Sequence, residues 1–194
     1  MSAALPRPRT LIGFAIGAAV LFGLAPALLS DFRLDLLAKY LCYAIVAVGI
    51  GLAWGRGGML VLGQGVFFGI GGYAMAMHLK LADAEALSGP GSLPDFMTLY
   101  GQLEALPSWW APFESPLFTL LAIPLLPMLV ALLLGLLIFK RRVRGAYFAI
   151  LSQALAAALA VWLVGNQGTT GGTNGLTDFK GFFGYDLEDP VNQR

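Results

Sequence analysis

The sequence holds few side chains that could take part in covalent chemistry. It contains one histidine, His78, and one cysteine, Cys42, and neither stands in a metal-binding or nucleophile–base spacing. A glycine-rich phosphate-binding loop is also absent from the sequence. We therefore predict no catalytic residue, no metal site and no cofactor, and polar side chains within apolar segments become the candidate functional groups.

Two glutamines, Gln64 and Gln153, interrupt long apolar stretches of the chain. An amide in hydrocarbon needs hydrogen-bond partners, so each should face protein or a water-filled cavity. For Gln153, both a hydrogen bond between helices and a place on a polar path remain open. For Gln64, which Gly63 and Gly65 flank, the alternatives are a polar path and close helix packing through Gly65 and Gly69.

Glycines are concentrated around Gln64, and eight of them fall between Gly55 and Gly72. Glycine disfavours a helix interior, yet a bilayer offers no water to an unpaired backbone group. We therefore expect a broken or closely packed segment, in which helix is lost between Gly55 and Gly63 and resumes by about Gly65. Interruptions of this kind point to solute sites in membrane transporters.

The elements that must position these groups follow from composition. Hydrophobic residues make up 58% of the chain and charged residues 12%, against roughly 25% charged in soluble domains. The predicted fold class is all-α, a polytopic integral membrane protein. A span needs about 20 apolar residues, and about five segments qualify: residues 10–30, 34–54, 59–79, 116–139 and 145–165. A cleaved signal peptide is the alternative for the first segment, although four further segments favour a retained helix.

The basic cluster Lys140–Arg144 sets the expected orientation, because short loops rich in lysine and arginine stay in the cytoplasm. Because successive spans cross the membrane in opposite directions, residues 80–115 are then expected to form an external loop and residues 166–194 an external tail. The net charge of +1 gives no signature of nucleic-acid binding. Cys42 has no second cysteine with which to form a disulfide within the chain.

The external loop carries local signals of its own. Pro94 followed by Asp95 favours the start of a short surface helix, with an irregular loop as the alternative. Trp109 and Trp110 suit the membrane–water interface. His78, at the outer end of the third segment, is also expected to be interfacial.

Two serines have expected structural roles: Ser115 at the start of a helix and Ser152 at a contact between two helices. Ser115 precedes Pro116, a combination that favours an N-cap and the first helical position. Ser152 and the alanines around it allow the backbone of a neighbouring helix to approach closely.

The expected external tail contains a second glycine-rich stretch, whose candidate residues are Gly171, Gly172, Thr173, Asn174 and Gly175. Asn-Gly is a strong turn pair, so turns are one interpretation. The other is that exposed backbone groups, with the threonine and asparagine side chains, bind a small polar solute or line its entrance.

Three stretches, in this order and spacing, resemble the permease subunits of branched-chain amino acid ABC importers. They are residues 60–73 (LVLGQGVFFGIGGY), 144–151 (RGAYFAIL) and 170–179 (TGGTNGLTDF). Within that family, residues 54–59 (WGRGGM), 93–97 (LPDFM) and 177–186 (TDFKGFFGYD) are most similar to the urea-importer permease of the LivM-like type. The resemblance runs from about residue 30 to the end of the chain. Val61 departs from the family, which often has serine at this position.

The resemblance implies a bacterial inner-membrane permease that forms a transmembrane path for urea with a homologous permease subunit. Separate ABC ATPase subunits would drive it, and a periplasmic solute-binding protein would deliver the solute. Permeases of this family continue through further spans and a cytoplasmic ATPase-coupling loop, so we expect this chain to be the N-terminal part of a permease domain. A branched-chain amino acid permease and a non-transporting membrane scaffold or orphan fragment remain the alternatives.

Residue chemistry and the resemblance together select the expected site residues. The translocation path is expected at Gly63, Gln64, Gly65, Phe68, Tyr73 and Gln153. In this path, Gly63 and Gly65 would leave room beside the backbone and Gln64 would make a polar contact with the solute. Phe68 and Tyr73 would shape the wall of the path. The outer vestibule is expected at Gly171, Gly172, Thr173, Asn174 and Gly175.

Overall fold

A computed structural model describes residues 8–58, 60–140, 146–183 and 185–186. The chain divides into two compact units, with the boundary between Ile45 and Val46. This boundary falls inside a long helix, α3 (Asp31–Gly55). Most of the basic cluster, residues 141–144, lies outside the described residues.

The first unit begins with a helix that is locally widened. It consists of α1 (Pro8–Ala19), a π-helical turn η1 (Val20–Leu24) and α2 (Ala25–Leu28). Pro26 lies in the first turn of α2 and has no backbone N–H, so it cannot continue the α-helical ladder. The π-helical turn directly before it is the kind of local adjustment that accommodates such a break.

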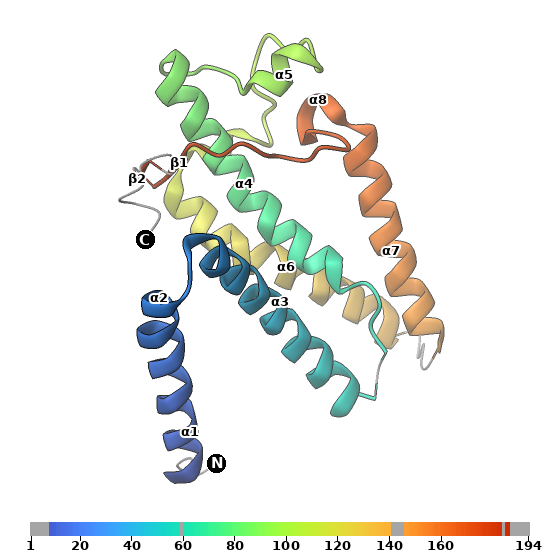
Figure 1. Ribbon diagram of the computed structural model, residues 1–194. Coiled ribbons are helices and arrows are strands. Elements are labelled where there is room, and N and C mark those ends of the chain that lie inside the picture. Colours follow the sequence, from blue (N-terminus) through green and yellow to red (C-terminus); the bar gives the residue numbers. More distant parts are fainter. Residues whose placement is uncertain (1–7, 59, 141–145, 184, 187–194) are drawn as a thin grey trace. The chain divides into compact units, whose positions relative to one another are not determined.

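The second unit holds the C-terminal part of α3 and, within the described residues, three further long helices with short elements near their ends (Figure 1). Its elements are α4 (Gln64–Ser88), α5 (Asp95–Leu99), the 3₁₀-helix η2 (Ala111–Glu114), α6 (Pro116–Lys140), α7 (Ala146–Gly165), α8 (Gln167–Thr170), β1 (Gly181–Phe182) and β2 (Tyr185–Asp186). Helix α4 packs chiefly against α6 and also contacts α7. The two short strands pair antiparallel, with Gly181 opposite Asp186. The predicted short helix at Asp95 and the predicted N-cap at Ser115 are both confirmed, the latter by a 3.4 Å bond from the Phe118 N–H to the Ser115 hydroxyl.

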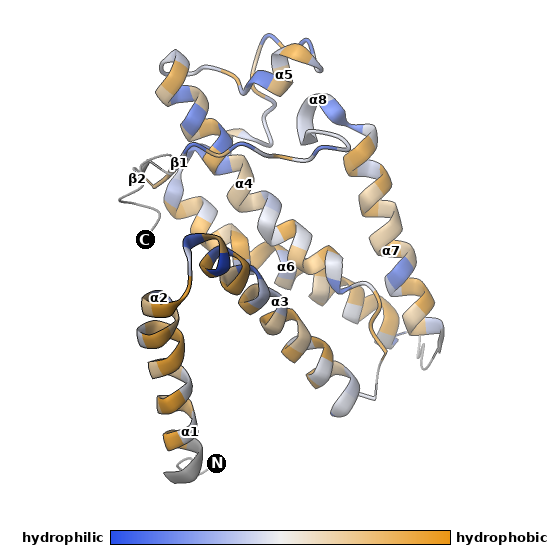
Figure 2. Ribbon diagram, in the orientation of Figure 1, coloured by the Kyte–Doolittle hydropathy of each residue, from blue (hydrophilic) through white to orange (hydrophobic). Residues whose placement is uncertain are grey.

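Four helical stretches within the described residues are long and apolar enough to cross a membrane. They are Leu11–Leu28, Asp31–Gly55, Pro116–Ile138 and Tyr147–Gly165. Figure 2 shows their predominantly hydrophobic colour and the polar residues that gather toward the C-terminal end of α4. The predicted class, an all-α polytopic membrane protein, is confirmed.

The expected third segment differs from the other four in its backbone. Helix α3 ends at Gly55 and α4 begins only at Gln64, so the predicted loss of helix in the glycine-rich stretch is confirmed. The helix from Gln64 to Leu79 is about 24 Å long at 1.5 Å per residue, shorter than the hydrocarbon core of about 30 Å. The helix then continues through Lys80 to Ser88, so the loop expected from residue 80 begins as helix.

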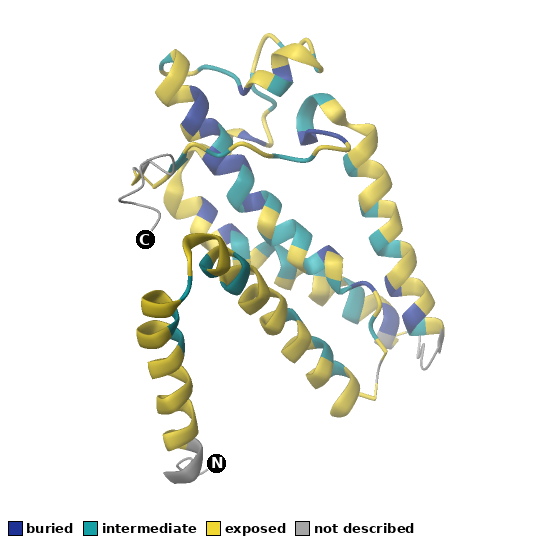
Figure 3. Cartoon of the chain, viewed as in Figure 1, coloured by how far each residue is buried: buried dark blue, intermediate teal, exposed yellow. Residues whose placement is uncertain are grey.

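The apolar core of the second unit lies where α4, α5, η2 and α6 meet, and its buried positions are dark blue in Figure 3. Trp110 is fully buried there, so the prediction that it anchors at the membrane interface is wrong. His78 is also buried, and its Nδ1 lies 2.8 Å from the Phe113 carbonyl oxygen. It therefore ties α4 to η2 and is not the interfacial side chain that its position in the sequence suggested.

Candidate functional site

The start of α4 is held against α7 by direct backbone contact. The backbone N–H of Leu62 donates a 3.2 Å hydrogen bond to the Ser152 hydroxyl. A Cβ atom placed on Gly63 would lie 2.7 Å from the Ser152 carbonyl carbon and still closer to its oxygen. Only glycine fits here, and the close approach predicted for Ser152 is confirmed. Gly63 is thus buried in protein, which is the condition under which non-helical backbone is tolerated at membrane depth.

A first cavity, of about 180 Å³, lies beside this contact between α4, α6 and α7. Gln64 and Ser152 are the polar side chains in its lining, and the remaining side chains are apolar. The lining residues are Val61, Gly63, Gln64, Phe67, Ala131, Leu134, Gly135, Ile138, Phe148, Leu151, Ser152 and Leu155. The cavity therefore places Gln64 among mostly apolar side chains.

A second cavity, of about 120 Å³, lies further along α4 and has no charged residue in its lining. Its walls are Gly69, Ile70, Tyr73, Met77, Trp109, Leu126, Leu159, Trp162, Leu163 and Thr170. The Tyr73 hydroxyl donates a 3.1 Å hydrogen bond to the Thr170 carbonyl oxygen. Tyr73 thus connects the middle of α4 to the residue that directly precedes the glycine loop.

The glycine loop, residues 171–175, needs glycine for two separate reasons. Gly171, Gly172 and Gly175 have φ of 79°, 61° and 67°, in the left-handed region that other residues rarely adopt. In addition, a Cβ atom on Gly171 would lie 2.6 Å from the carbonyl carbon of Gly175. The loop is therefore a compact turn after α8, with Thr173 and Asn174 exposed at its tip.

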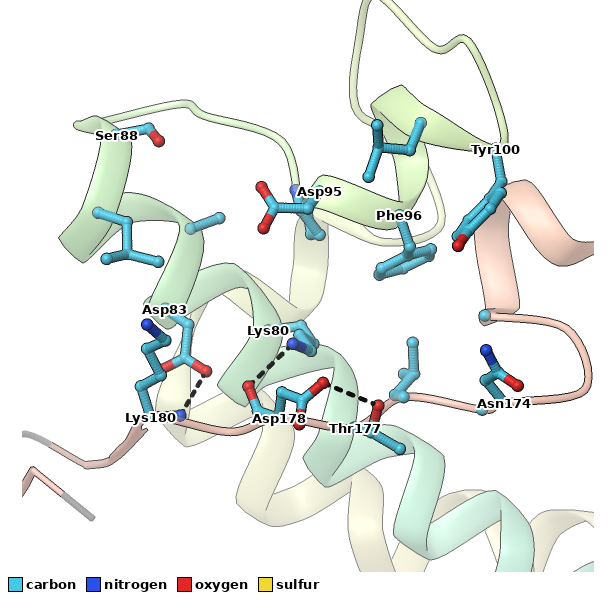
Figure 4. A pocket seen from close by; sticks show the side chains of 17 residues that line it. Lys80, Asp83, Ser88, Asp95, Phe96, Tyr100, Asn174, Thr177, Asp178 and Lys180 are labelled. Atoms are coloured by element: carbon cyan, nitrogen blue, oxygen red, sulfur yellow. Dashed lines mark hydrogen bonds between the residues drawn. The ribbon is translucent and has the colours of Figure 1, made fainter. Parts of the chain in front are cut away.

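A third and polar pocket, of about 280 Å³, lies beside this loop, and we call it the outer pocket (Figure 4). Its walls come from the end of α4, from α5 and from the segment that follows the glycine loop. The lining residues are Lys80, Asp83, Ala84, Leu87, Ser88, Pro94, Asp95, Phe96, Leu99, Tyr100, Gly171, Asn174, Gly175, Leu176, Thr177, Asp178 and Lys180.

Two of the charged side chains in the outer pocket are engaged by the chain itself. Asp83 is 7% exposed, and its two oxygens accept 2.9 Å hydrogen bonds from the backbone N–H groups of Lys180 and Gly181. The Lys80 ammonium donates a 3.0 Å bond to the Asp178 carbonyl oxygen and lies 5.7 Å from the centre of the Phe179 ring. Both side chains therefore hold the wall of the pocket.

The three cavities follow one another along α4. The helix and the residues just before it contribute Val61–Phe67 to the first, Gly69–Met77 to the second and Lys80–Ser88 to the third. At 1.5 Å per residue, α4 is about 38 Å long, comparable with the thickness of a membrane.

The structure brings together part of the expected site. Gly63 and Gln64 line the first cavity, Tyr73 lines the second, and Gly171, Asn174 and Gly175 line the outer pocket. Gly172 packs against the side chain of Gln167. By contrast, Gly65, Phe68, Gln153 and Thr173 are exposed and do not line these three cavities. The roles assigned to all of these residues stay predictions.

Sequence reasoning missed the polar residues that α4 and α5 contribute to the outer pocket. Residues 80–88 were expected to be loop, so no face was assigned to them. Lys80, Asp83, Ala84 and Leu87 have the i, i+3, i+4, i+7 spacing of one helix face. This periodicity is the signal that would have extended the helix and placed these residues on one wall.

Taken together, the apolar helices, the non-helical residues just before α4 and the row of cavities along α4 define a multi-pass membrane protein. The family model described as branched-chain amino acid transport system / permease component matches residues 32–189. The chain therefore belongs to this family of ABC-type permeases, which are transporters and not enzymes. No curated protein and no solved structure matches the chain.

Proposed function

We propose that this chain forms part of the path by which an ABC importer carries urea across the bacterial inner membrane. The observation that carries the proposal is the row of three cavities along α4, from the Gly63–Ser152 contact to the outer pocket. The row begins where the non-helical residues before α4 reach α7 and Gly63 is buried, and non-helical backbone within the membrane is typical of solute sites in transporters.

The lining of the first two cavities supports a small uncharged solute. Neither cavity has a charged residue in its wall, and the polar side chains there are those of Gln64, Ser152, Tyr73 and Thr170. A zwitterion would have to give up the hydration of two charges in such surroundings, whereas a neutral amide exchanges only hydrogen bonds. Urea is a neutral amide with N–H donors and one carbonyl acceptor, so it suits this lining.

The outer pocket offers neutral polar groups as well as charged ones. Because Lys80 and Asp83 are engaged by backbone groups, the Asn174 amide and the Tyr100 hydroxyl are candidates for contact with an amide solute. The similarity of residues 54–59, 93–97 and 177–186 to urea-importer permeases is a second, independent support.

The partners follow from the mechanism of an ABC importer. We propose that a homologous permease subunit completes the path and that separate ABC ATPase subunits supply the energy. A periplasmic solute-binding protein would deliver urea to the outer pocket. In this scheme the chain itself binds no nucleotide and needs no cofactor.

A branched-chain amino acid is the second candidate solute. The family description names this class, and the outer pocket contains the apolar side chains of Leu87, Phe96, Leu99 and Leu176. A zwitterionic solute would still meet an uncharged second cavity, which is why urea is the primary proposal. A non-transporting scaffold is the remaining alternative.

Uptake by cells that carry the complete transporter tests the proposal. Strains with and without this chain would be given labelled urea or labelled leucine at equal concentration. We expect deletion of the chain to abolish saturable urea uptake and to leave leucine uptake unchanged. Loss of leucine uptake alone would replace urea by the amino acid, and unchanged uptake of both would support the scaffold.

A further inference from the structure

The outer pocket has one wall that is not helical. Residues 176–183, which we call the strap, follow the glycine loop and lie against the C-terminal half of α4. Four strap residues, Leu176, Thr177, Asp178 and Lys180, line the pocket. Where the strap lies therefore decides the width of the pocket and the position of its polar groups.

Asp83 provides the main polar attachment of the strap to α4. Its buried carboxylate uses one oxygen for the Lys180 N–H and the other for the Gly181 N–H, both at 2.9 Å (Figure 4 draws the first). Two backbone donors on one carboxylate fix the strap in position and direction, as one hydrogen bond would not. Bonds of this kind, to an ionised acceptor, are stronger than neutral ones.

Neighbouring side chains of α4 reinforce this attachment. Lys80 binds the Asp178 carbonyl oxygen at 3.0 Å. The His78 ring lies 5.2 Å, between centroids, from the ring of Phe183 near the end of the strap. These contacts flank the Asp83 attachment, so α4 holds the strap from Asp178 to Phe183.

We propose that Asp83 is a positioning residue for solute capture, which holds the strap as the wall of the outer pocket without itself binding solute. Both of its oxygens are occupied by the strap, so Asp83 acts through the placement of Thr177 and Asp178. This inference rests on the proposed function, because it assumes that the outer pocket receives the solute.

Hydrogen exchange tests the attachment without any solute. In the purified transporter, Asp83→Asn should accelerate deuterium uptake in a peptide covering residues 176–183 by about tenfold, the effect of losing one charge-assisted hydrogen bond. Glu85→Gln is the matched control, since Glu85 is an exposed carboxylate on the same helix that does not line the pocket. Unchanged exchange in Asp83→Asn would overturn the proposed attachment.

Transport kinetics test the positioning role. Asp83→Asn should raise KM for labelled urea by about tenfold while the maximal rate per assembled complex stays near wild type. A loss of assembled complex with unchanged KM would reduce Asp83 to a residue needed only for folding, and the proposal would be wrong.

A covalent replacement for the carboxylate keeps the proposal testable if single variants assemble poorly. A Cβ atom at residue 181 would lie 3.4 Å from Asp83 Oδ1, so Asp83→Cys with Gly181→Cys in a Cys42→Ser background is the pair with which to replace the carboxylate contact by a disulfide. Oxidation should restore a low KM and slow exchange, and reduction should reverse both. An oxidised pair that keeps the high KM of Asp83→Asn would refute the positioning role. Absence of urea uptake in the wild type would instead refute the proposed solute and leave the exchange test valid.

Discussion

Gly63 lies against the backbone of Ser152, and its side chain could not be larger than hydrogen. Gly63→Ala would place a Cβ atom 2.7 Å from the Ser152 carbonyl carbon, and an overpacked contact of this kind costs about 1–3 kcal/mol. We expect a lower thermal unfolding midpoint in detergent. Gly65→Ala is the control, because nothing lies within 4 Å of its Cβ position. Equal midpoints for the two variants would contradict this account of the contact.

Gln64 and Gln153 are expected to differ because Gln64 lines a cavity and Gln153 lies on the exposed side of α7. Gln64→Leu should lower urea uptake per assembled complex by about threefold to thirtyfold, since one hydrogen bond in a membrane is worth about 0.6 to 2 kcal/mol. Normal uptake in Gln64→Leu would remove this residue from the path.

Gln153→Leu should act mainly on assembly if Gln153 binds a neighbouring subunit. Gln153 is exposed on α7, and an amide in hydrocarbon needs a hydrogen-bond partner, which a neighbouring subunit would supply. We expect less assembled complex with near-normal uptake per complex, measured by co-purification alongside labelled urea uptake. Reduced uptake per complex would instead place Gln153 on the path.

At the scale of elements, the glycine loop turns the chain from α8 into the strap, and its shape depends on Gly171. Gly171 combines a φ of 79° with a Cβ position 2.6 Å from the carbonyl carbon of Gly175. Gly91 has a similar φ of 78° but nothing within 4 Å. Gly91→Ala should therefore cost about 1–2 kcal/mol of backbone strain, whereas Gly171→Ala should cost about 1–3 kcal/mol more. Denaturant unfolding measures the free energy of unfolding of both variants. An equal decrease in the two variants would show that crowding at Gly171 is unimportant.

At the scale of the whole molecule, the basic cluster predicts which end faces the cytoplasm. The contacts of α5 with α8, α4 with η2 and α7 with α8 gather the outer pocket at one end of the second unit. Cysteine introduced at Thr177, in a Cys42→Ser background, should react with an impermeant thiol reagent in intact spheroplasts, because the opposite end carries Lys140. Protection of that cysteine together with labelling of Arg142→Cys would reverse the orientation.

The sequence alone determined the class of protein and the place of its backbone break. Long apolar segments in a bilayer must pair their backbone groups internally, as helices do, and eight glycines between residues 55 and 72 disfavour an ordinary lipid-facing helix there. The helix starts at Pro94–Asp95 and Ser115 were also predictable, because capping and first-turn preferences act within a few residues.

The tertiary structure decided which polar residues share a site. Hydropathy ended the third segment at Leu79, but the helix runs on to Ser88 because packing against α6 and η2 buries one of its faces. Trp110 and His78 are internal for the same reason. The partners of Asp83 lie 97 and 98 residues away in the chain, a separation that no local pattern encodes. Local preferences fix helices and turns, whereas only packing shows which side chains face one another.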